Sequence, residues 1–153
     1  MEKVIVFDMD GTIADLYGVE GWLDYLMAED ATPYRVAEPL VDMIALIDVL
    51  NDLRAIGWIV AVTSWLSKGS TADYDAKVRA AKREWLTRYN FPADEIHLVK
   101  YGATKADSTR KYGAGMQILF DDNEKVRAGW HLGEAHDVQN IIDDLLNLIE
   151  MEG

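Results

Sequence analysis

The chain contains no cysteine and only three prolines among its 153 residues. The lack of cysteine excludes disulfides, a thiolate nucleophile and a cysteine-ligated zinc site. Long hydrophobic runs are also missing: the longest, such as Val4–Phe7 and Trp58–Val62, have five residues or fewer, whereas a membrane-spanning helix needs ~20. No signal-peptide pattern precedes Val4. We therefore expect a soluble, cytoplasmic protein with no membrane partner.

Basic residues are scarce as well. Lys and Arg total 15 against 27 Asp and Glu, which gives a formal net charge of −12. Such a field repels nucleic acid unless a local basic patch overcomes it, so we expect no nucleic-acid partner. The same field repels a phosphorylated substrate, so a site that handles phosphate needs its own cations close by. The oligomeric state stays open.

Enough apolar residues are present for one compact domain over 1–153, since half of the chain is hydrophobic. Four of the apolar segments show no polar alternation, which is typical of strands covered on both faces in a parallel sheet. These four segments are Val4–Phe7, Trp58–Val62, Ile96–Val99 and Met116–Phe120.

Helical patterns lie between these predicted strands. Apolar residues from Leu40 to Leu53 keep three- and four-residue spacing until Gly57, and a second helix is predicted over Ala72–Tyr89. A shorter helix is predicted over Ala103–Tyr112, and Asp137 is expected to cap a last one. This alternation predicts an α/β fold of the doubly wound type, a three-layer α/β/α sandwich.

Residues 15–39 fit the alternation least well. The segment Trp22–Met27 is predicted to form one short amphipathic helix, followed by a loop through Pro33 and Pro39. We expect a minimal helical cap inserted over the mouth of the sheet. An ordinary connection packed to one side is the alternative.

Polar side chains follow the predicted strands, and a lysine opens the helix before the last strand. In chain order these residues are Asp8, Asp10, Thr63, Ser64, Lys105, Asp121 and Asp122. Ligands of open α/β sheets bind beyond the carboxyl ends of the strands, so we expect these side chains to converge there.

Four carboxylates at one edge raise one another's pKa unless a cation lies among them. Oxygen ligands without His or Cys favour a hard cation, and Mg²⁺ is the usual one in phosphate chemistry. Asp8 and Asp10 are two residues apart, so one can attack and bind the ion while the other reaches a leaving group. Thr63 and Lys105 are donors of the kind that hold phosphate oxygens. Each Asp taken alone is equally compatible with a turn or a helix cap.

The stretch Val-Ile-Val-Phe-Asp-Met-Asp-Gly-Thr, residues 4–12, resembles the first motif of haloacid dehalogenase-like (HAD) phosphohydrolases. Thr63, Lys105 and Asp121-Asp122 are similar to the second, third and fourth motifs, in the same order. The resemblance implies a Rossmann-like parallel sheet, a Mg²⁺ cofactor and an aspartyl-phosphate intermediate.

Roles for individual residues are also implied by this resemblance. Asp8 corresponds to the nucleophile and a metal ligand, and Asp10 to the acid–base residue, which binds the metal through its backbone carbonyl. Thr63 and Lys105 correspond to phosphate-binding residues. Asp121 completes the metal site with Asp122 in support.

A closer resemblance is to 5′(3′)-deoxyribonucleotidases, carried by Thr63-Ser64, Tyr74-Asp75 and Lys82-x-x-Trp85, although Trp65 stands where that family has proline. It implies that Ser64 and Lys82 help to hold the phosphate of a nucleotide. Trp22 and Tyr25 are then available to cover the base. In the alternative interpretation, Lys82 belongs to a solvated basic helix face.

The sequence thus predicts a Mg²⁺-dependent phosphatase whose substrate is a small phosphorylated compound, most simply a (deoxy)nucleoside monophosphate. Three alternatives stay open: a phosphatase of sugar phosphates or other metabolites, a nucleic-acid end phosphatase, and a non-catalytic binding domain of the same fold. The histidines His97, His131 and His136 are expected to pack or face solvent rather than to catalyse.

Overall fold

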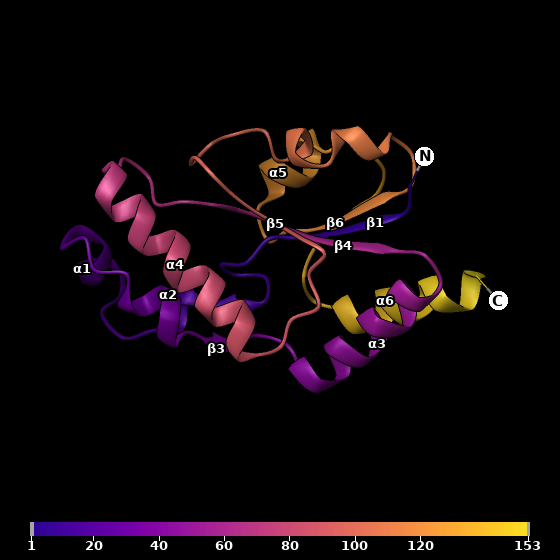
Figure 1. Ribbon diagram of the computed structural model, residues 1–153, viewed down its shortest axis with the longest axis horizontal. Coiled ribbons are helices and arrows are strands. Elements are labelled where there is room, and N and C mark those ends of the chain that lie inside the picture. The colour runs from indigo at the N-terminus through magenta and orange to yellow at the C-terminus, as the bar shows by residue number, and fades with distance from the viewer. Residues whose placement is uncertain (1, 153) are drawn as a thin grey trace.

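The computed structural model describes residues 2–152 (Figure 1). Its centre is a five-stranded parallel sheet in the order β5-β4-β1-β6-β7. The strands are β1 (Val4–Phe7), β4 (Ile59–Trp65), β5 (Glu95–Val99), β6 (Gln117–Phe120) and β7 (Ala135–His136). In the register of the central strands, Phe7 of β1 lies between Val62 of β4 and Phe120 of β6. The carboxyl ends of these three strands therefore meet at one edge.

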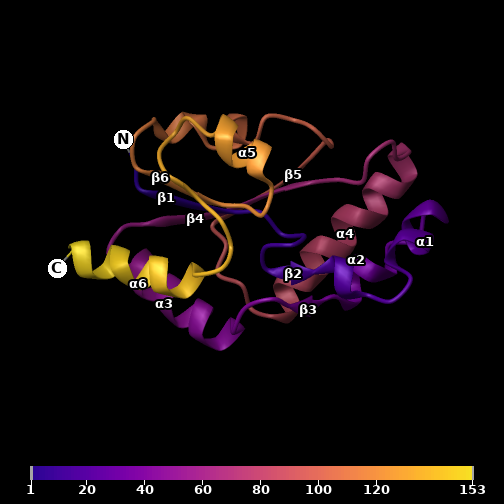
Figure 2. The ribbon, with the colours of Figure 1, turned by 180° about the vertical axis from the view of Figure 1, so that it is seen from behind.

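Helices cover both faces of the sheet (Figures 1 and 2). Helices α3 (Met43–Ala55), α4 (Ala72–Arg88) and α6 (Ile141–Glu152) contribute to the larger hydrophobic core on one face. On the other face lie α5 (Glu124–Gly129) and two short 3₁₀ helices, η2 (Lys105–Ser108) and η3 (Arg110–Tyr112). The predicted three-layer α/β/α sandwich is confirmed.

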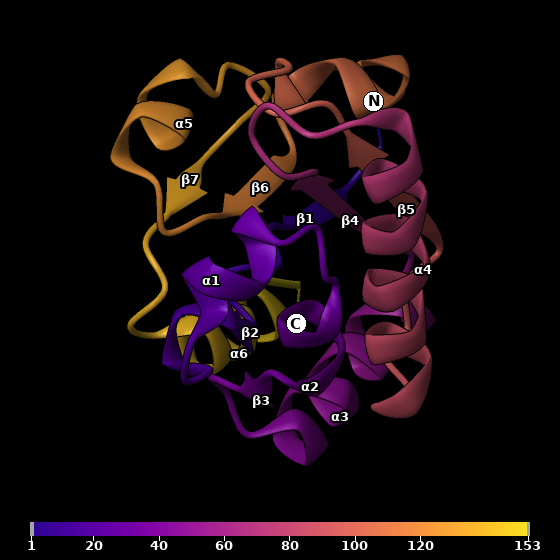
Figure 3. The same ribbon diagram turned by 90° about the vertical axis from the view of Figure 1, so that its left-hand side faces the viewer.

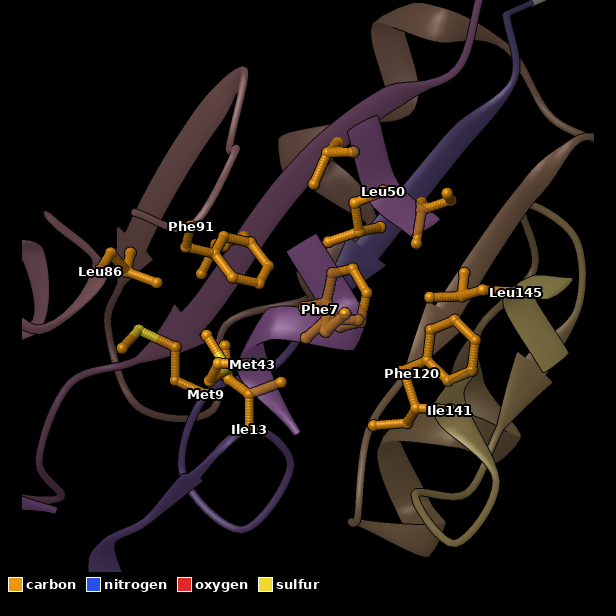
Figure 4. Close-up of a cluster of buried hydrophobic side chains, with 14 of the residues drawn as sticks. Phe7, Met9, Ile13, Met43, Leu50, Leu86, Phe91, Phe120, Ile141 and Leu145 are labelled. Carbon is orange, nitrogen blue, oxygen red and sulfur yellow. The ribbon is translucent and has the colours of Figure 1, made fainter. Parts of the chain in front are cut away.

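The alternation of side chains along β1 explains both cores. Ile5 and Phe7 point into the larger core, and Val4 and Val6 point into the smaller one, because successive strand residues face opposite sides. Phe7 stacks on Phe120 with ring centroids 5.3 Å apart. Figure 4 shows both rings among the buried hydrophobic side chains of the larger core.

Three sequence-based boundaries are wrong. The predicted helix over residues 103–112 is two 3₁₀ turns, because the short polar side chains from Asp107 to Thr109 favour turns over a continuous helix. Asp137 does not cap the last helix, which begins at Ile141; its carboxylate instead accepts a hydrogen bond from the Val138 N–H. Strand β4 continues to Trp65, so Thr63 and Ser64 lie inside it.

Helix α3 also differs from its prediction. It begins at Met43 rather than Leu40, because the Asp42 side chain accepts a hydrogen bond from the Ala45 N–H and caps the first turn. Ile44, one of the apolar residues between Leu40 and Leu53 that carry the predicted spacing, is 78% exposed and does not face the core. The residues of α3 that are buried are Met43, Leu46, Val49, Leu50 and Leu53.

The insertion at residues 15–39 is closed by a two-stranded antiparallel pair, β2 (Ala14–Asp15) with β3 (Glu38–Pro39). Between them lie η1 (Leu16–Gly18), α1 (Trp22–Met27) and α2 (Thr32–Val36). Helix α1 is the predicted one, whereas α2 replaces a predicted loop, because a proline in the first helical turn sacrifices no hydrogen bond. Figure 3 shows α1 and α2 in front of the sheet, on the side where its strands end.

No helix within residues 2–152 combines the length and the hydropathy that a bilayer-spanning segment requires.

Candidate active site

Asp8 follows β1 directly and is held in place from three directions. Its N–H continues the sheet by donating to the Phe120 carbonyl at 3.0 Å. Its two carboxylate oxygens accept hydrogen bonds from the Lys105 ammonium, at 2.9 Å, and from the Thr12 hydroxyl, at 3.0 Å. The side chain is almost completely buried, so its orientation is fixed before any ligand arrives.

Asp121 and Asp122 follow β6 and meet Asp8. One carboxylate oxygen from each of the three residues lies within 4.8 Å of the others. Burial and the Asp8 charge raise the pKa of Asp121, and the same two causes raise the pKa of Asp122 to about 7. Carboxylates in this arrangement repel one another, and a divalent cation would relieve that repulsion. The donor set therefore fits a hard cation such as Mg²⁺.

Gly11 allows the chain to turn away from this cluster. Its φ is +80°, a conformation that glycine adopts at little cost. A Cβ atom at this position would lie 2.2 Å from the Asp122 Oδ2 atom. Both the turn and the approach of Asp122 to Asp8 thus require a residue without a side chain.

Lys105 lies at the start of η2. It provides a positive charge beside the acidic cluster, as expected for a phosphate site in a protein of net charge −12. Its ammonium donates to Asp8 and, at 2.6 Å, to the Asp121 carboxylate. Burial alone would lower the pKa of Lys105, but these two carboxylates raise it, so the residue stays charged. Its side chain is 4% exposed, and it lines the cavity described below.

Asp10 lies beside Asp8 and is paired with Lys82 of α4. The Lys82 ammonium donates to the Asp10 Oδ2 atom at 2.9 Å and to the Ser64 hydroxyl at 2.8 Å. Burial raises the pKa of Asp10, and the Lys82 charge opposes that rise. Lys82 is 0% exposed, so its interpretation as part of a solvated basic face is wrong.

The two hydroxyl residues of β4 face opposite sides. Ser64 lines the cavity, whereas Thr63 is fully buried, and its hydroxyl finds no hydrogen-bond partner within residues 2–152. Thr63 corresponds to the phosphate-binding residue in the resemblance to HAD phosphohydrolases, yet of these two residues only Ser64 lines the cavity.

A cavity of about 730 Å³ opens above these residues, between the ends of the strands and the 15–39 insertion. Two aromatic pairs line it. Tyr17 and Trp22 meet edge to face with ring centroids 5.0 Å apart, and Trp65 and Tyr101 meet at the same distance at 55°. Of the described residues of α1, Trp22, Leu23, Leu26 and Met27 line the cavity, and Tyr25 does not.

Sequence reasoning missed Tyr17, Thr12 and Tyr101. Burial and the charges of Asp10 and Asp122 raise the pKa of Tyr17 to about 12, so its hydroxyl stays protonated and able to donate. Thr12 belongs to the Asp-x-Asp-Gly-Thr motif, which was a usable signal for its role. Tyr101 follows β5 in a turn, and its distance in sequence from the other site residues gave no such signal.

The histidines lie outside the cavity as expected, although two of them do contact carboxylates. His97 contacts Glu95 at 2.7 Å, and His136 contacts Glu134 at 3.1 Å. His136 also lies 3.3 Å from Asp144 of α6. Among the residues that line the cavity there is no histidine within the described chain.

No protein-family model and no curated protein matches the sequence. Among solved structures, a D,D-heptose 1,7-bisphosphate phosphatase from Burkholderia thailandensis superposes with a TM-score of 0.59 at 14% identity, over 97% of this chain and 99% of that one. The two proteins share a fold. This agrees with the fold that the resemblance to HAD phosphohydrolases implied.

A chain of the Pnkp1/Rnl/Hen1 complex also matches, with a TM-score of 0.59 and 17% identity. The match covers 90% of this chain but 45% of that chain, so the present sequence spans less than half of its length. At 14% and 17% sequence identity, these two matches show a shared fold and nothing more.

Proposed function

We propose that the protein is a Mg²⁺-dependent phosphomonoesterase that works through an aspartyl phosphate on Asp8. The observation that carries this proposal is the environment of Asp8: a fixed carboxylate at the floor of a cavity, beside a second carboxylate and a buried ammonium. A nucleophile, a proton donor and a cation that can hold phosphate oxygens are thus present within one site.

The chemistry takes two displacements at phosphorus. A carboxylate oxygen of Asp8 attacks phosphorus while the bond to the ester oxygen breaks and Asp10 gives that oxygen a proton. Water then attacks phosphorus while the bond from phosphorus to the Asp8 oxygen breaks and Asp10 accepts a proton from that water, which releases inorganic phosphate and regenerates the Asp8 carboxylate and protonated Asp10. Lys105 and Ser64 hold the phosphate oxygens throughout. When bound by Asp8, Asp121, Asp122 and the Asp10 carbonyl, Mg²⁺ supplies positive charge for the phosphate oxygens.

We propose a nucleoside monophosphate as the substrate. The two aromatic pairs at the cavity, Tyr17 with Trp22 and Trp65 with Tyr101, offer flat surfaces on which a base can stack. A cavity of about 730 Å³ is also within the range of ligand pockets. A sugar phosphate is the second candidate, since the heptose bisphosphate phosphatase has the same fold over nearly its whole length.

The test is a panel of deoxynucleoside monophosphates, hexose phosphates and p-nitrophenyl phosphate, each assayed with Mg²⁺ and with EDTA. We expect phosphate release only with Mg²⁺, and the highest kcat/KM for nucleotides. Asp8→Asn keeps the shape of the side chain but cannot attack phosphorus, so we expect no turnover from a variant that still folds. Wild-type turnover by Asp8→Asn would refute the covalent mechanism, and faster turnover of hexose phosphates would favour the second candidate.

A further inference from the structure

All three hydrogen-bond donors of the Lys82 ammonium are used within the protein. They go to the Asp10 carboxylate at 2.9 Å, the Ser64 hydroxyl at 2.8 Å and the Trp65 carbonyl at 2.8 Å. A lysine ammonium has three donors, so none is left for a ligand. The side chain is also 0% exposed, and Lys82 is absent from the residues of the described chain that line the cavity.

The surroundings of Lys82 hold its ammonium in one position. The ring of Tyr34 from α2 lies over it, with the ring centroid 5.1 Å from Nζ. One turn further along α4, Trp85 is fully buried and donates from its indole N–H to the Ala37 carbonyl at 2.8 Å. Helix α4 is thereby fixed against α2, and the Lys82 ammonium contacts Ser64 and Trp65 at the end of β4.

The contact with Asp10 is selective for one oxygen. Lys82 binds the Oδ2 atom, whereas Oδ1 accepts no hydrogen bond from any residue between 2 and 152. The carboxyl group of Asp10 lines the cavity and is 17% exposed. An acid–base residue held by one oxygen presents the other to the ester, without free rotation about its last bond.

We propose that Lys82 is a positioning residue that fixes Asp10 for proton transfer, and not a phosphate-binding residue. The proposal rests on the proposed function, because it assigns a role within that chemistry. The proposal gives the two buried lysines different roles. Lys105 lines the cavity and can reach the phosphate, whereas Lys82 does not line the cavity and acts through Asp10.

The two roles predict different dependence on the leaving group. Proton transfer to the ester oxygen matters greatly for an alkyl phosphate and little for 2,4-dinitrophenyl phosphate, whose leaving group departs without a proton. A phosphate-binding lysine contributes equally to both, since the phosphoryl group is common to them. We expect Lys82→Met to lower kcat/KM for an alkyl phosphate ~10²-fold or more, the range of general acid catalysis, and for dinitrophenyl phosphate less than ~5-fold.

Lys77→Met is the matched control, because Lys77 lies on the exposed face of the same helix. We expect it to leave both rates within about twofold of wild type, as surface substitutions usually do. An equal loss for both esters in Lys82→Met would overturn the proposal. Wild-type protein that hydrolyses neither ester would instead refute the proposed function, so the two failures are distinguishable.

A second pair of variants covers the case in which Lys82→Met leaves Asp10 unpaired and does not fold. Asp10→Asn removes the negative charge of the ion pair, and Asp10→Asn/Lys82→Met removes both charges. If Lys82 acts through Asp10, the double variant has the same kcat/KM for the alkyl phosphate as Asp10→Asn within about threefold. A further loss of ~10-fold or more in the double variant would show a separate role and overturn the proposal.

Discussion

Gly11 controls how closely Asp122 approaches Asp8. Two independent constraints require glycine at this position. The backbone φ is +80°, and a Cβ atom would lie 2.2 Å from Asp122 Oδ2. Gly57, after the end of α3, is subject only to the backbone constraint: its φ is +102°, and nothing lies within 4 Å of a Cβ atom built there. The two glycines therefore separate the effect of backbone strain from the effect on the acidic cluster.

We expect Gly11→Ala to weaken Mg²⁺ binding and Gly57→Ala not to. Both variants pay about 1–2 kcal/mol for a left-handed alanine, which lowers the Tm by several degrees. Only Gly11→Ala also displaces the Asp122 carboxylate from the cluster. The measurement is the rise in Tm when Mg²⁺ replaces EDTA, which we expect in wild type and Gly57→Ala and expect to be greatly reduced in Gly11→Ala. Equal rises in the two variants would contradict this account.

At the scale of elements, the 15–39 insertion supplies one side of the cavity, and the ends of the strands supply the other. Trp22 from α1 and Tyr101 after β5 represent the two sides. Base stacking on one aromatic side chain contributes about 1–3 kcal/mol, so under the proposed function loss of either ring is expected to weaken nucleotide binding but not the chemistry at phosphorus.

We expect Trp22→Ala and Tyr101→Ala each to raise the KM for a nucleoside monophosphate by about 5- to 150-fold, at 1.4 kcal/mol per factor of ten. The KM for p-nitrophenyl phosphate changes little, because this small ester reaches the aromatic pairs only slightly. Tyr25→Ala is the control within α1, since Tyr25 is 37% exposed and does not line the cavity. If all three variants change the nucleotide KM equally, stacking is not the cause.

The periodic patterns of strands and helices could be predicted from the sequence. Which of two neighbouring residues lines the cavity could not. The apolar strands and the carboxylates after β1 and β6 were found because an aspartate directly after a buried run is conspicuous. Thr63 and Ser64 were both predicted to bind phosphate, with Thr63 matched to the second motif of the HAD resemblance. Strand β4 was expected to end at Val62 but runs on to Trp65, so the two side chains point to opposite sides of the strand.

Lys82 shows a second limit of sequence reasoning. It follows Val78 by one helical turn and adjoins the buried Ala81, so its position on α4 is on the inner face. The resemblance to deoxyribonucleotidases gave it a phosphate-binding role, and a solvated helix face was the alternative. Its partners Asp10 and Ser64 are 72 and 18 residues away. A contact over such a separation is set by the tertiary fold, and no local pattern predicts it.

At the scale of the whole molecule, folding gathers like charges in a protein whose net charge is already −12. Burial and the Asp8 charge raise the pKa of Asp122 from an ordinary 3.8 to about 7. Between these values the folded protein binds more protons than the unfolded chain, so the free energy of unfolding falls as pH rises. The acids whose pKa is lowered, such as Asp94, act in the opposite direction, but below about pH 4.

We therefore expect the Tm of the protein in EDTA to fall from pH 5.5 to about pH 7 and to level off by pH 8, where Asp122 is ionised in both the folded and the unfolded state. Mg²⁺ binds the ionised cluster, so its stabilising effect is larger at pH 8 than at pH 5.5, and at one hundred times its Kd it contributes about 2.7 kcal/mol. Thermal unfolding across this range checks both statements. Asp122→Asn removes one of the acids with a raised pKa, so we expect a shallower fall of the Tm in EDTA than in wild type. A wild-type Tm that rises with pH in EDTA would contradict this prediction.

The pairing of β2 with β3 brings Ala14 opposite Pro39, so the two ends of the 15–39 insertion lie side by side. Asp8 and Asp10 precede it, and Lys105, Asp121 and Asp122 follow far downstream. A shorter or longer stretch of chain could connect these two neighbouring points without altering the spacing of the central strands. If the proposed function is right, the insertion that would select the substrate is an exchangeable module, and the sheet with its acidic cluster is the frame into which it is set.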